Sequence, residues 1–249
     1  MEGKIIMNDY SKPLDKDGWS EHYNIESLNQ VINSIRNEKV SVWSKELVKI
    51  CSEGESCLEI GCGTGISSLW LAKNGFNVTS LDYTESSVTL VKTAAEKLGY
   101  SNITVIQADA TKELPFKEKQ FDYAFQAGLL EHFETNEQIR LLRLWKKNCK
   151  RMISMIPNAS SIPYRVGKLI MENKGTWEYG LEIPKHSFAE EFTKAGITVE
   201  KEYSIGTEWA MRFLPKRHYI RKFFNKLERQ CYNLDEYMQG YLLVTIGRC

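Results

Sequence analysis

The stretch that decides the fold is Cys57-Leu58-Glu59-Ile60-Gly61-Cys62-Gly63-Thr64-Gly65. A short apolar run ends in an acidic residue, and glycines then fall at every second position. A helix-compatible segment, 66–73, follows directly, so the pattern predicts strand, tight turn and helix. Glycine lacks a Cβ, which allows positive φ and lets a bound molecule lie against bare backbone. The N-terminus of the following helix directs unpaired N–H groups into the turn, which we therefore expect to be electropositive.

The glycine spacing excludes two common nucleotide-binding loops. A dinucleotide-binding G-x-G-x-x-G loop would need its third glycine at Ile66 or at Ser68. The G-x-x-x-x-G-K-[ST] pattern of a P-loop does not occur either. What remains, Glu59-x-Gly61-x-Gly63-x-Gly65, resembles motif I of the class I S-adenosylmethionine-dependent methyltransferases. Taken alone, the glycines also suit a strand-to-helix turn that binds nothing.

The composition is that of an ordinary soluble globular chain, with 42% hydrophobic and 26% charged residues among 249. This length allows one α/β domain, which we expect to span 1–249. A formal net charge of +1 and a pI of about 7.6 predict no particular partner. No apolar run reaches the length of a membrane span, the N-terminus lacks the apolar core of a signal peptide, and the six cysteines form no C-x-x-C pair. These features favour a cytoplasmic protein.

Strand-like and helix-like segments alternate after the glycine turn. The strand-like runs lie at 77–81, 103–107, 121–125 and 151–156. Helix-like segments, with apolar residues three and four positions apart, lie between these runs and also precede the first strand. Thr135 and Gln138 predict a capping box at the start of one of these helices. The alternation predicts an α/β fold with a parallel sheet and helices on both faces.

Acidic residues stand at the ends of three predicted strands. Glu59 ends the first, Asp82 ends the second, and Asp109 lies just beyond the third. Ligands of such sheets bind at the carboxyl ends of the strands. Any one of these acids could be a surface charge or a helix cap, but three at one edge favour a ligand with several donors. A carboxylate can accept from both hydroxyls of a ribose.

Residues 56–156, within an expected cofactor-binding core of 51–156, resemble the class I methyltransferases as a whole. The glycine motif, the strand-end acids and the segment Gln126-Ala127-Gly128 occur in the order of that family. The resemblance implies a Rossmann-like, doubly wound sheet of seven strands whose last strands form an antiparallel hairpin. It also implies S-adenosyl-L-methionine as the cofactor and S-adenosyl-L-homocysteine as its product.

The resemblance further implies roles for individual residues. Asp82 would hold the ribose hydroxyls, and Tyr83 would lie against the adenine unless it is only an aromatic at the sheet edge. Asp109 would accept from the adenine amino group, while the backbone N–H of Ala110 reaches a ring nitrogen. Glu59 would orient the loop or, through water, the methionine ammonium. Two further roles are implied for residues that would also bind the cofactor. The backbone of the glycine turn would let the cofactor approach closely at Gly61, Gly63 and Gly65, and Gln126 would lie beside the methionine part.

The segment Gly128-Leu129-Leu130-Glu131-His132-Phe133 is similar to the V-L-E-H stretch of ubiquinone-pathway O-methyltransferases. His132 is the first choice for a general base, and Glu131 is the second candidate. The alternative is that both residues only tie the loop and cap the next helix. A metal site of Glu131, His132 and His186 would need a further glutamate where this chain has Gly128, so no metal is predicted.

Three regions outside the core are expected to shape an acceptor site. The first, 1–50, comprises a tail that either orders over a ligand or stays disordered, followed by helices. The others are insertions at 157–186 and 207–239, which are too long for plain connections. The basic, aromatic segment 212–229 would contact an acidic substrate, RNA or a membrane. Otherwise it is an amphipathic helix that packs four side chains inward: Ile220, Phe223, Phe224 and Leu227.

The sequence thus predicts an enzyme that transfers a methyl group from S-adenosylmethionine to an oxygen or nitrogen of a small molecule, with a specialised metabolite favoured. The alternatives are an RNA or protein methyltransferase that uses 212–229, and a non-catalytic cofactor-binding protein. No membrane partner is expected, nucleic acid is not favoured, and the chain would act as a monomer or homodimer.

Overall fold

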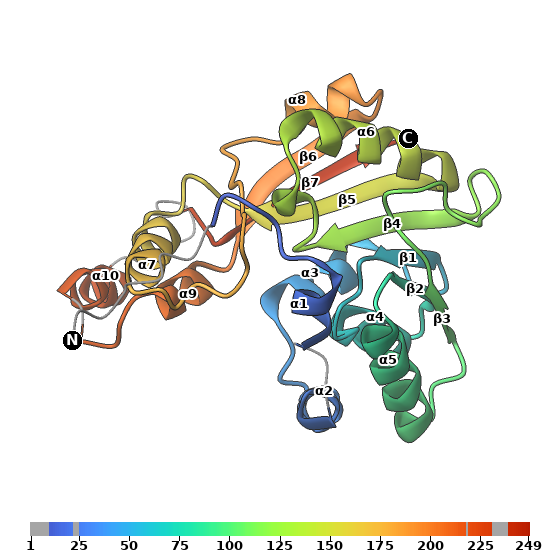
Figure 1. Ribbon diagram of the computed structural model, residues 1–249, viewed down its shortest axis with the longest axis horizontal. Helices are drawn as coiled ribbons and strands as arrows, with labels where there is room; N and C mark the ends of the chain where they lie inside the picture. The colour runs from blue at the N-terminus through green and yellow to red at the C-terminus, as the bar shows by residue number, and fades with distance from the viewer. Residues whose placement is uncertain (1–9, 22–24, 218, 231–238) are drawn as a thin grey trace.

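A seven-stranded sheet organises the protein in the computed structural model, which describes residues 10–21, 25–217, 219–230 and 239–249 (Figure 1). The strand order is β3-β2-β1-β4-β5-β7-β6. The first five strands are parallel, and β7 runs antiparallel to both β5 and β6. The strands are β1 (Ser56–Ile60), β2 (Asn77–Asp82), β3 (Ile103–Gln107), β4 (Phe121–Ala127), β5 (Cys149–Pro157), β6 (Thr198–Ile205) and β7 (Leu242–Arg248). The predicted Rossmann-like, doubly wound sheet with a terminal antiparallel hairpin is confirmed.

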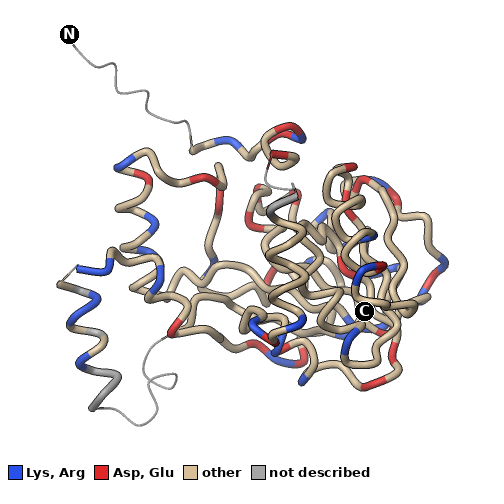
Figure 2. Tube along the Cα trace, turned by 90° about the horizontal axis from the view of Figure 1, so that it is seen from below, with Lys and Arg blue, Asp and Glu red and all other residues tan. Residues whose placement is uncertain are grey.

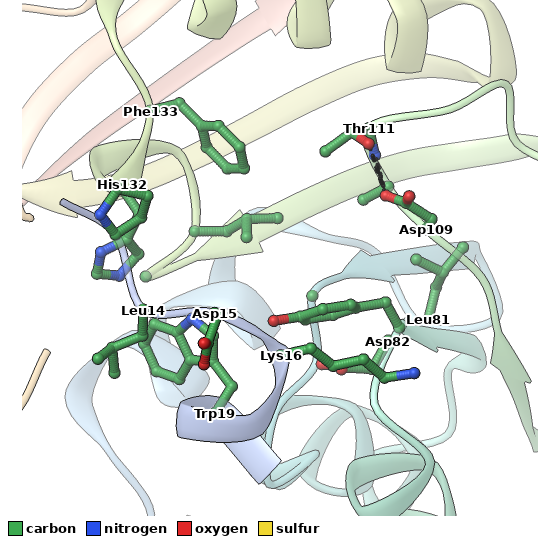
Figure 3. Close-up of a pocket in the computed structure, with 16 residues that line it drawn as sticks. Leu14, Asp15, Lys16, Trp19, Leu81, Asp82, Asp109, Thr111, His132 and Phe133 are labelled. Carbon is green, nitrogen blue, oxygen red and sulfur yellow. Dashed lines mark hydrogen bonds between the residues drawn. The ribbon is translucent and has the colours of Figure 1, made fainter. Parts of the chain in front are cut away.

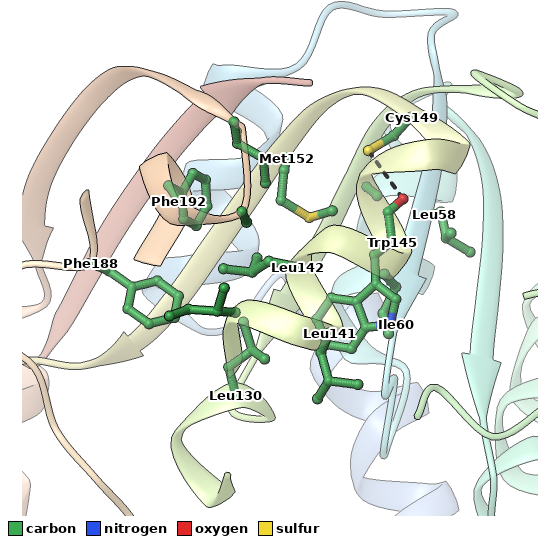
Figure 4. Packing of buried hydrophobic residues seen from close by; sticks show 14 of the residues in the cluster. Leu58, Ile60, Leu130, Leu141, Leu142, Trp145, Cys149, Met152, Phe188 and Phe192 are labelled. Carbon is green, nitrogen blue, oxygen red and sulfur yellow. Dashed lines mark hydrogen bonds between the residues drawn. The ribbon is translucent and has the colours of Figure 1, made fainter. Parts of the chain in front are cut away.

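Helices cover both faces of this sheet (Figure 1). One face carries α3 (Val42–Ile50), α4 (Ile66–Lys73) and α5 (Glu85–Leu98), and α2 (Ile25–Arg36) packs against α4 and α5. The other face carries α6 (Thr135–Trp145) and α8 (Ala189–Lys194), with the 3₁₀ turns η1 (Leu130–His132) and η2 (Lys146–Asn148) at either end of α6. The alternation of side chains along a strand explains this division, because β1 turns Leu58 and Ile60 to the α6 face and Cys57 to the α3–α4 face. Figure 4 shows the cluster on the α6 face, which includes the buried Trp145.

The start of α6 differs from the prediction. The N-cap of α6 is Glu134, which makes no side-chain capping bond, and Thr135 is the first helical residue. Gln138 instead donates to the carbonyls of Leu130 and Phe133, both at 2.9 Å. The Thr135 hydroxyl accepts from Lys185 Nζ at 2.8 Å. The predicted capping box is wrong because both side chains bond to groups outside the helix end.

Two helical segments project from the sheet beyond the carboxyl end of β5. They are α7 (Ile162–Asn173), between β5 and β6, and a stretch between β6 and β7 with α9 (Thr207–Ala210), η3 (Met211–Phe213) and α10 (Tyr219–Gln230). Figure 1 shows α7, α9 and α10 together at one side of the molecule. Phe213 of η3 packs closely against α7. A Cβ placed on Gly167 of α7 would lie only 2.4 Å from the Phe213 Cβ. Tyr164 also packs edge-on against the Phe213 ring.

The helix α10 presents basic residues along much of its length (Figure 2). Phe223 is 59% exposed, so the prediction that it packs inward is wrong. The side chains of Ile220, Phe224 and Leu227, and His218, lie outside the described residues. Among the described residues, no helix combines the length and apolar character needed to cross a membrane.

Candidate active site

The glycine turn between β1 and α4 adopts backbone conformations that favour glycine. Gly61, Gly63 and Gly65 have φ values of +71°, +52° and +69°. A Cβ on Gly65 would lie 2.4 Å from Val91 Cγ2 of α5, and one on Gly61 would lie 2.8 Å from Leu129 Cδ2. The alternate glycines therefore allow the turn to pack closely against its neighbours on both sides.

Asp82 ties this turn to the end of β2. Its Oδ2 accepts from the Gly63 N–H at 2.9 Å, and its Oδ1 accepts from the Thr84 N–H and hydroxyl, both at 2.9 Å. The carboxylate is buried, yet it lines a cavity at the tips of β1 and β2. Carboxylate oxygens have about four lone-pair sites, so Asp82 retains acceptor capacity toward that cavity.

Glu59 lies behind the turn, on the α4 side of β1. Its Oε2 accepts from the backbone N–H of Ser68 at 3.0 Å and from the Ser68 hydroxyl. Burial raises the pKa of Glu59 to about 8, although the bonds from Ser68 oppose the rise. The side chain lines a second cavity. Burial therefore favours the protonated form of Glu59, and a cation bound beside it would favour the ionised form.

The first cavity has a volume of about 370 Å³ and lies between the strand tips and the segment 10–21, which we call the N-terminal strap (Figure 3). Asp109 lies at its rim, where its Oδ1 accepts from the Thr111 N–H at 2.9 Å and from the Thr111 hydroxyl at 2.7 Å. Burial alone would raise the pKa of Asp109, but the bonds from Thr111 outweigh it and the pKa lies below its ordinary value. The lining on the sheet side includes Asp82, Tyr83, Asp109, Ala110, Leu129, His132 and Phe133.

The N-terminal strap closes this cavity from outside. It contains α1 (Lys16–Glu21), and Leu14, Lys16 and Trp19 all face the cavity. Trp19 packs edge-on against His132, with 5.1 Å between ring centroids. The Leu181 N–H donates to the Lys12 carbonyl at 2.8 Å. The described part of the tail thus lies over the cavity, and residues 1–9 and 22–24 lie outside the described residues.

His132 is the titratable ring that faces the first cavity. It is buried, and its Nδ1 lies 2.5 Å from the Leu181 carbonyl oxygen. A carbonyl only accepts, so Nδ1 carries the proton in the neutral ring and Nε2 keeps its lone pair. Burial lowers the pKa of His132 below its ordinary value of 6.5, against the opposing effect of the Leu181 carbonyl. At neutral pH the ring is therefore uncharged and able to accept a proton at Nε2.

Glu131 lines neither cavity. The side chain is 2% exposed, and its Oε2 has no hydrogen-bond partner within the described structure. Burial, with the nearby Glu182 carboxyl, raises the pKa of Glu131 well above its ordinary value. Burial also raises the pKa of Glu182 to about 7, and the Tyr164 hydroxyl donates to that carboxyl. Of the two catalytic candidates, only His132 reaches a cavity.

Gln126 also lies beneath the site rather than in it. Its Nε2 donates to Ser154 Oγ at 2.6 Å, and its Oε1 accepts from the N–H groups of Leu129 and Leu130 at 3.0 and 3.2 Å. These bonds hold the loop that carries His132. His186 is exposed, with Nδ1 2.8 Å from Ser160 Oγ. Among the described residues, no group of three or more histidine, cysteine or acidic side chains is arranged to hold a metal ion.

The second cavity, of about 940 Å³, adjoins the first. Trp19, Gly61 and Gly128 line both of them. Its inner end is formed by the glycine turn, with Glu59, Gly63 and Ser67. Its outer end is formed by side chains from three separate regions of the chain: Lys39, Trp43, Tyr179, Trp209 and Arg212.

Comparison with known proteins agrees with this geometry. Residues 57–151 match the family model described as a methyltransferase domain. A ubiquinone biosynthesis O-methyltransferase of Rickettsia akari is 28% identical over 132 residues, which make up 52% of this chain and 49% of that protein. A protein of Papaver bracteatum named "Probable (S)-tetrahydroprotoberberine N-methyltransferase 2" is 34% identical over 37% of this chain and 26% of its own length.

The fold is shared more widely than the sequence. The crystal structure of a SAM-dependent methyltransferase from Aquifex aeolicus superposes with a TM-score of 0.55 at 15% identity, covering 94% of this chain and 98% of that one. This chain has the class I methyltransferase fold, and its residues 57–151 are similar to a methyltransferase domain. The matched region spans about half of the Rickettsia akari relative, at 49% of its length.

The residues that line the first cavity fit S-adenosylmethionine. Two carboxylates, Asp82 and Asp109, border a cavity that also has aromatic and apolar walls, as a ribose diol and an adenine require. The turn at Gly61 leaves no room for a Cβ and offers bare backbone where the two cavities meet. Asp82, Tyr83, Asp109 and Ala110 would hold the adenosine part, and Glu59 would stand near the methionine part.

The sequence did not predict that Leu181 and Glu182, from the first insertion, lie beside the loop that carries His132 and Glu131. Trp19 comes from the tail, whose aromatic residues favour ordering over a ligand. Trp19 carried a signal, since an aromatic in an otherwise polar tail is costly to leave in water. Leu181 contacts His132 through its backbone carbonyl, so the identity of its side chain carries no signal in the sequence.

Proposed function

We propose that this protein transfers a methyl group from S-adenosylmethionine to an oxygen or nitrogen of a small-molecule acceptor. The observation that carries the proposal is the meeting of two cavities at Gly61 and Gly128, one bordered by the strand-end acids and the other by aromatic side chains. The named relatives, an O-methyltransferase and an N-methyltransferase, support either acceptor atom.

His132 would serve as the general base of this reaction toward an acceptor atom at the junction of the two cavities, because it packs against Trp19, which lines both. When bound, S-adenosylmethionine supplies a methyl group that is already electrophilic, so the chain must chiefly position the acceptor and exclude water. The neutral ring of His132 accepts the acceptor's proton at Nε2, and the bond from Nδ1 to the Leu181 carbonyl stabilises the charged ring. The Trp19 ring on one face of His132 keeps water from it.

An RNA or protein acceptor is the weaker alternative. The basic residues of α10, such as Lys222 and Lys226, do not line either cavity. Arg221 donates to the Leu214 carbonyl at 3.0 Å and so helps to hold α10 against its own insertion. A small acceptor bound within the second cavity agrees better with these positions.

Incubation of the protein with methyl-labelled S-adenosylmethionine and cell extract tests the proposal. We expect label in small metabolites, identified by mass spectrometry. Label only in RNA or protein would replace the proposal with the alternative. Absence of any label, although calorimetry detects cofactor binding, would indicate a non-catalytic cofactor-binding protein.

A further inference from the structure

The outer end of the second cavity combines aromatic rings with positive charge. We call Lys39, Trp43, Tyr179, Trp209 and Arg212 the outer wall. The Trp43 and Trp209 rings meet edge to face, with 4.9 Å between centroids and 83° between planes. The guanidinium carbon of Arg212 lies 4.1 Å from the centroid of the Trp209 ring. These contacts join α3, which precedes β1, to the insertion between β6 and β7.

Among the described residues, no carboxylate pairs with the positive charge of the outer wall. Neither Lys39 nor Arg212 forms an ion pair with them, and neither has a hydrogen bond from its side chain to them. Of the described residues that line this cavity, Glu59 is the single acid; it bonds to Ser68, and burial raises its pKa to about 8. A cavity with two cations and no facing carboxylate attracts an anion.

The position of Arg212 makes it the better anion-binding group of the two. Stacking on Trp209 limits the conformations of the side chain, so less entropy is lost when its N–H groups bind a ligand. A guanidinium presents paired donors that match the two oxygens of a carboxylate, whereas an ammonium acts as a point charge. The two indole rings are nearly perpendicular, so a planar group beside them would stack on the face of one ring and meet the other at its edge.

We propose that the methyl acceptor is a planar aromatic acid, whose carboxylate binds Arg212 and whose ring lies against Trp43 and Trp209. This inference rests on the proposed function, because it assigns the second cavity to the acceptor. Arg212 is then the residue that selects acids over neutral molecules of the same shape.

Binding to the protein saturated with S-adenosylhomocysteine tests this proposal. The probes are 3,4-dihydroxybenzoate, its methyl ester and its primary amide, titrated by calorimetry. We expect the acid to bind at least about tenfold more tightly than the ester or the amide, as for one charge-assisted contact. Arg212→Met, which keeps a long apolar stem over Trp209, should remove this preference, and Arg212→Lys should keep part of it. Arg217→Met is the matched control, since Arg217 is exposed and lines neither cavity.

Each other outcome counts against the proposal. Equal binding of the acid and the ester, binding of none of the probes, or a preference that survives Arg212→Met would overturn it. So would a loss of S-adenosylhomocysteine affinity in Arg212→Met, because Arg212 would then serve the cofactor's own carboxylate. Failure of the wild-type protein to bind S-adenosylhomocysteine would instead overturn the proposed function.

Discussion

At the scale of single residues, Asp82 accepts three hydrogen bonds from the turn and from Thr84 while facing the first cavity. Asp82→Asn keeps the shape but replaces one acceptor oxygen with a donor and removes the charge. We expect affinity for S-adenosylhomocysteine to fall about 30-fold, equivalent to about 2 kcal/mol for a lost charge-assisted contact. Calorimetry measures this change, and unchanged affinity would place the ribose elsewhere.

Asp122→Asn is the matched control. Asp122 stands near the amino end of β4, where it accepts from Ser56 and Lys150, and the bond from Lys150 helps hold its pKa at about 2. It lines neither cavity. Its replacement should leave cofactor affinity within about twofold, because distant sites act independently.

His132 offers a prediction in pH as well as in rate. A protonated ring cannot accept a proton, so kcat should rise with pH and level off once His132 is neutral. Because burial lowers the pKa of His132, the midpoint should lie below 6.5. His132→Gln should lower kcat by about 10²–10⁴-fold and remove this acid limb, with a small change in cofactor affinity. His186→Gln, at an exposed position, should leave kcat and its pH dependence unchanged. If the fall in kcat at low pH persists in His132→Gln, a group other than His132 causes it.

At the scale of elements, the glycine turn is constrained by its neighbour α5 as well as by its own backbone. Gly65 and Gly99 both have positive φ, at +69° and +74°, but no atom lies within 4 Å of a Cβ placed on Gly99. Gly99→Ala should therefore cost about 1 kcal/mol of the free energy of unfolding. Gly65→Ala should cost about 1–3 kcal/mol more, since its Cβ would meet Val91 at 2.4 Å. Urea denaturation compares the two, and equal losses would show that α5 yields at no cost.

The local pattern of apolar, polar and glycine residues was enough to predict the helices and strands and to place the acidic residues that end the strands. Glu59, Asp82 and Asp109 could be placed at one edge because the carboxyl ends of parallel strands meet there. The predicted capping box at Thr135 is wrong because Thr135 is the first residue of the helix rather than its N-cap. Its hydroxyl accepts a hydrogen bond from Lys185, which is distant in sequence. The prediction that Phe223 packs inward is wrong because the orientation of α10 depends on how the two insertions pack together. The spacing of apolar residues along one helix does not report that packing.

The outer wall shows the same limit for the site. The outer wall is built from residues that are widely separated in the sequence: Lys39, Trp43, Tyr179, Trp209 and Arg212. The sequence shows the aromatic and basic character of these residues, and the segment 212–229 is basic and aromatic throughout. Which of them would meet could not be predicted, because the meeting depends on tertiary packing between α3 and the insertions.

At the scale of the whole molecule, buried carboxyl groups should make stability depend on pH. Burial raises the pKa of Glu59 to about 8, that of Glu182 to about 7, and that of Glu131 well above 4.5. A group with a raised folded pKa stabilises fully below its unfolded pKa, and that stability is lost as pH rises through the folded value. The free energy of unfolding should thus fall between pH 4.5 and 8.

Glu182→Gln isolates one share of this effect. The amide oxygen can still accept from the Tyr164 hydroxyl, while the titration is removed. We expect a shallower fall in unfolding free energy between pH 4.5 and 7, measured by urea denaturation. Glu190→Gln, at an exposed ion pair with Lys194, is the control and should leave the slope unchanged. Identical slopes for wild type and Glu182→Gln would mean that Glu182 does not titrate in this range.

The peptide unit around Leu181 is shared by two partners with different tasks. Its N–H donates to Lys12 of the N-terminal strap, and its carbonyl accepts from His132. A displacement of the strap would therefore remove a partner from the same residue that orients the His132 ring. The cover of the first cavity and the orientation of the imidazole are in this way linked through the main chain of one leucine.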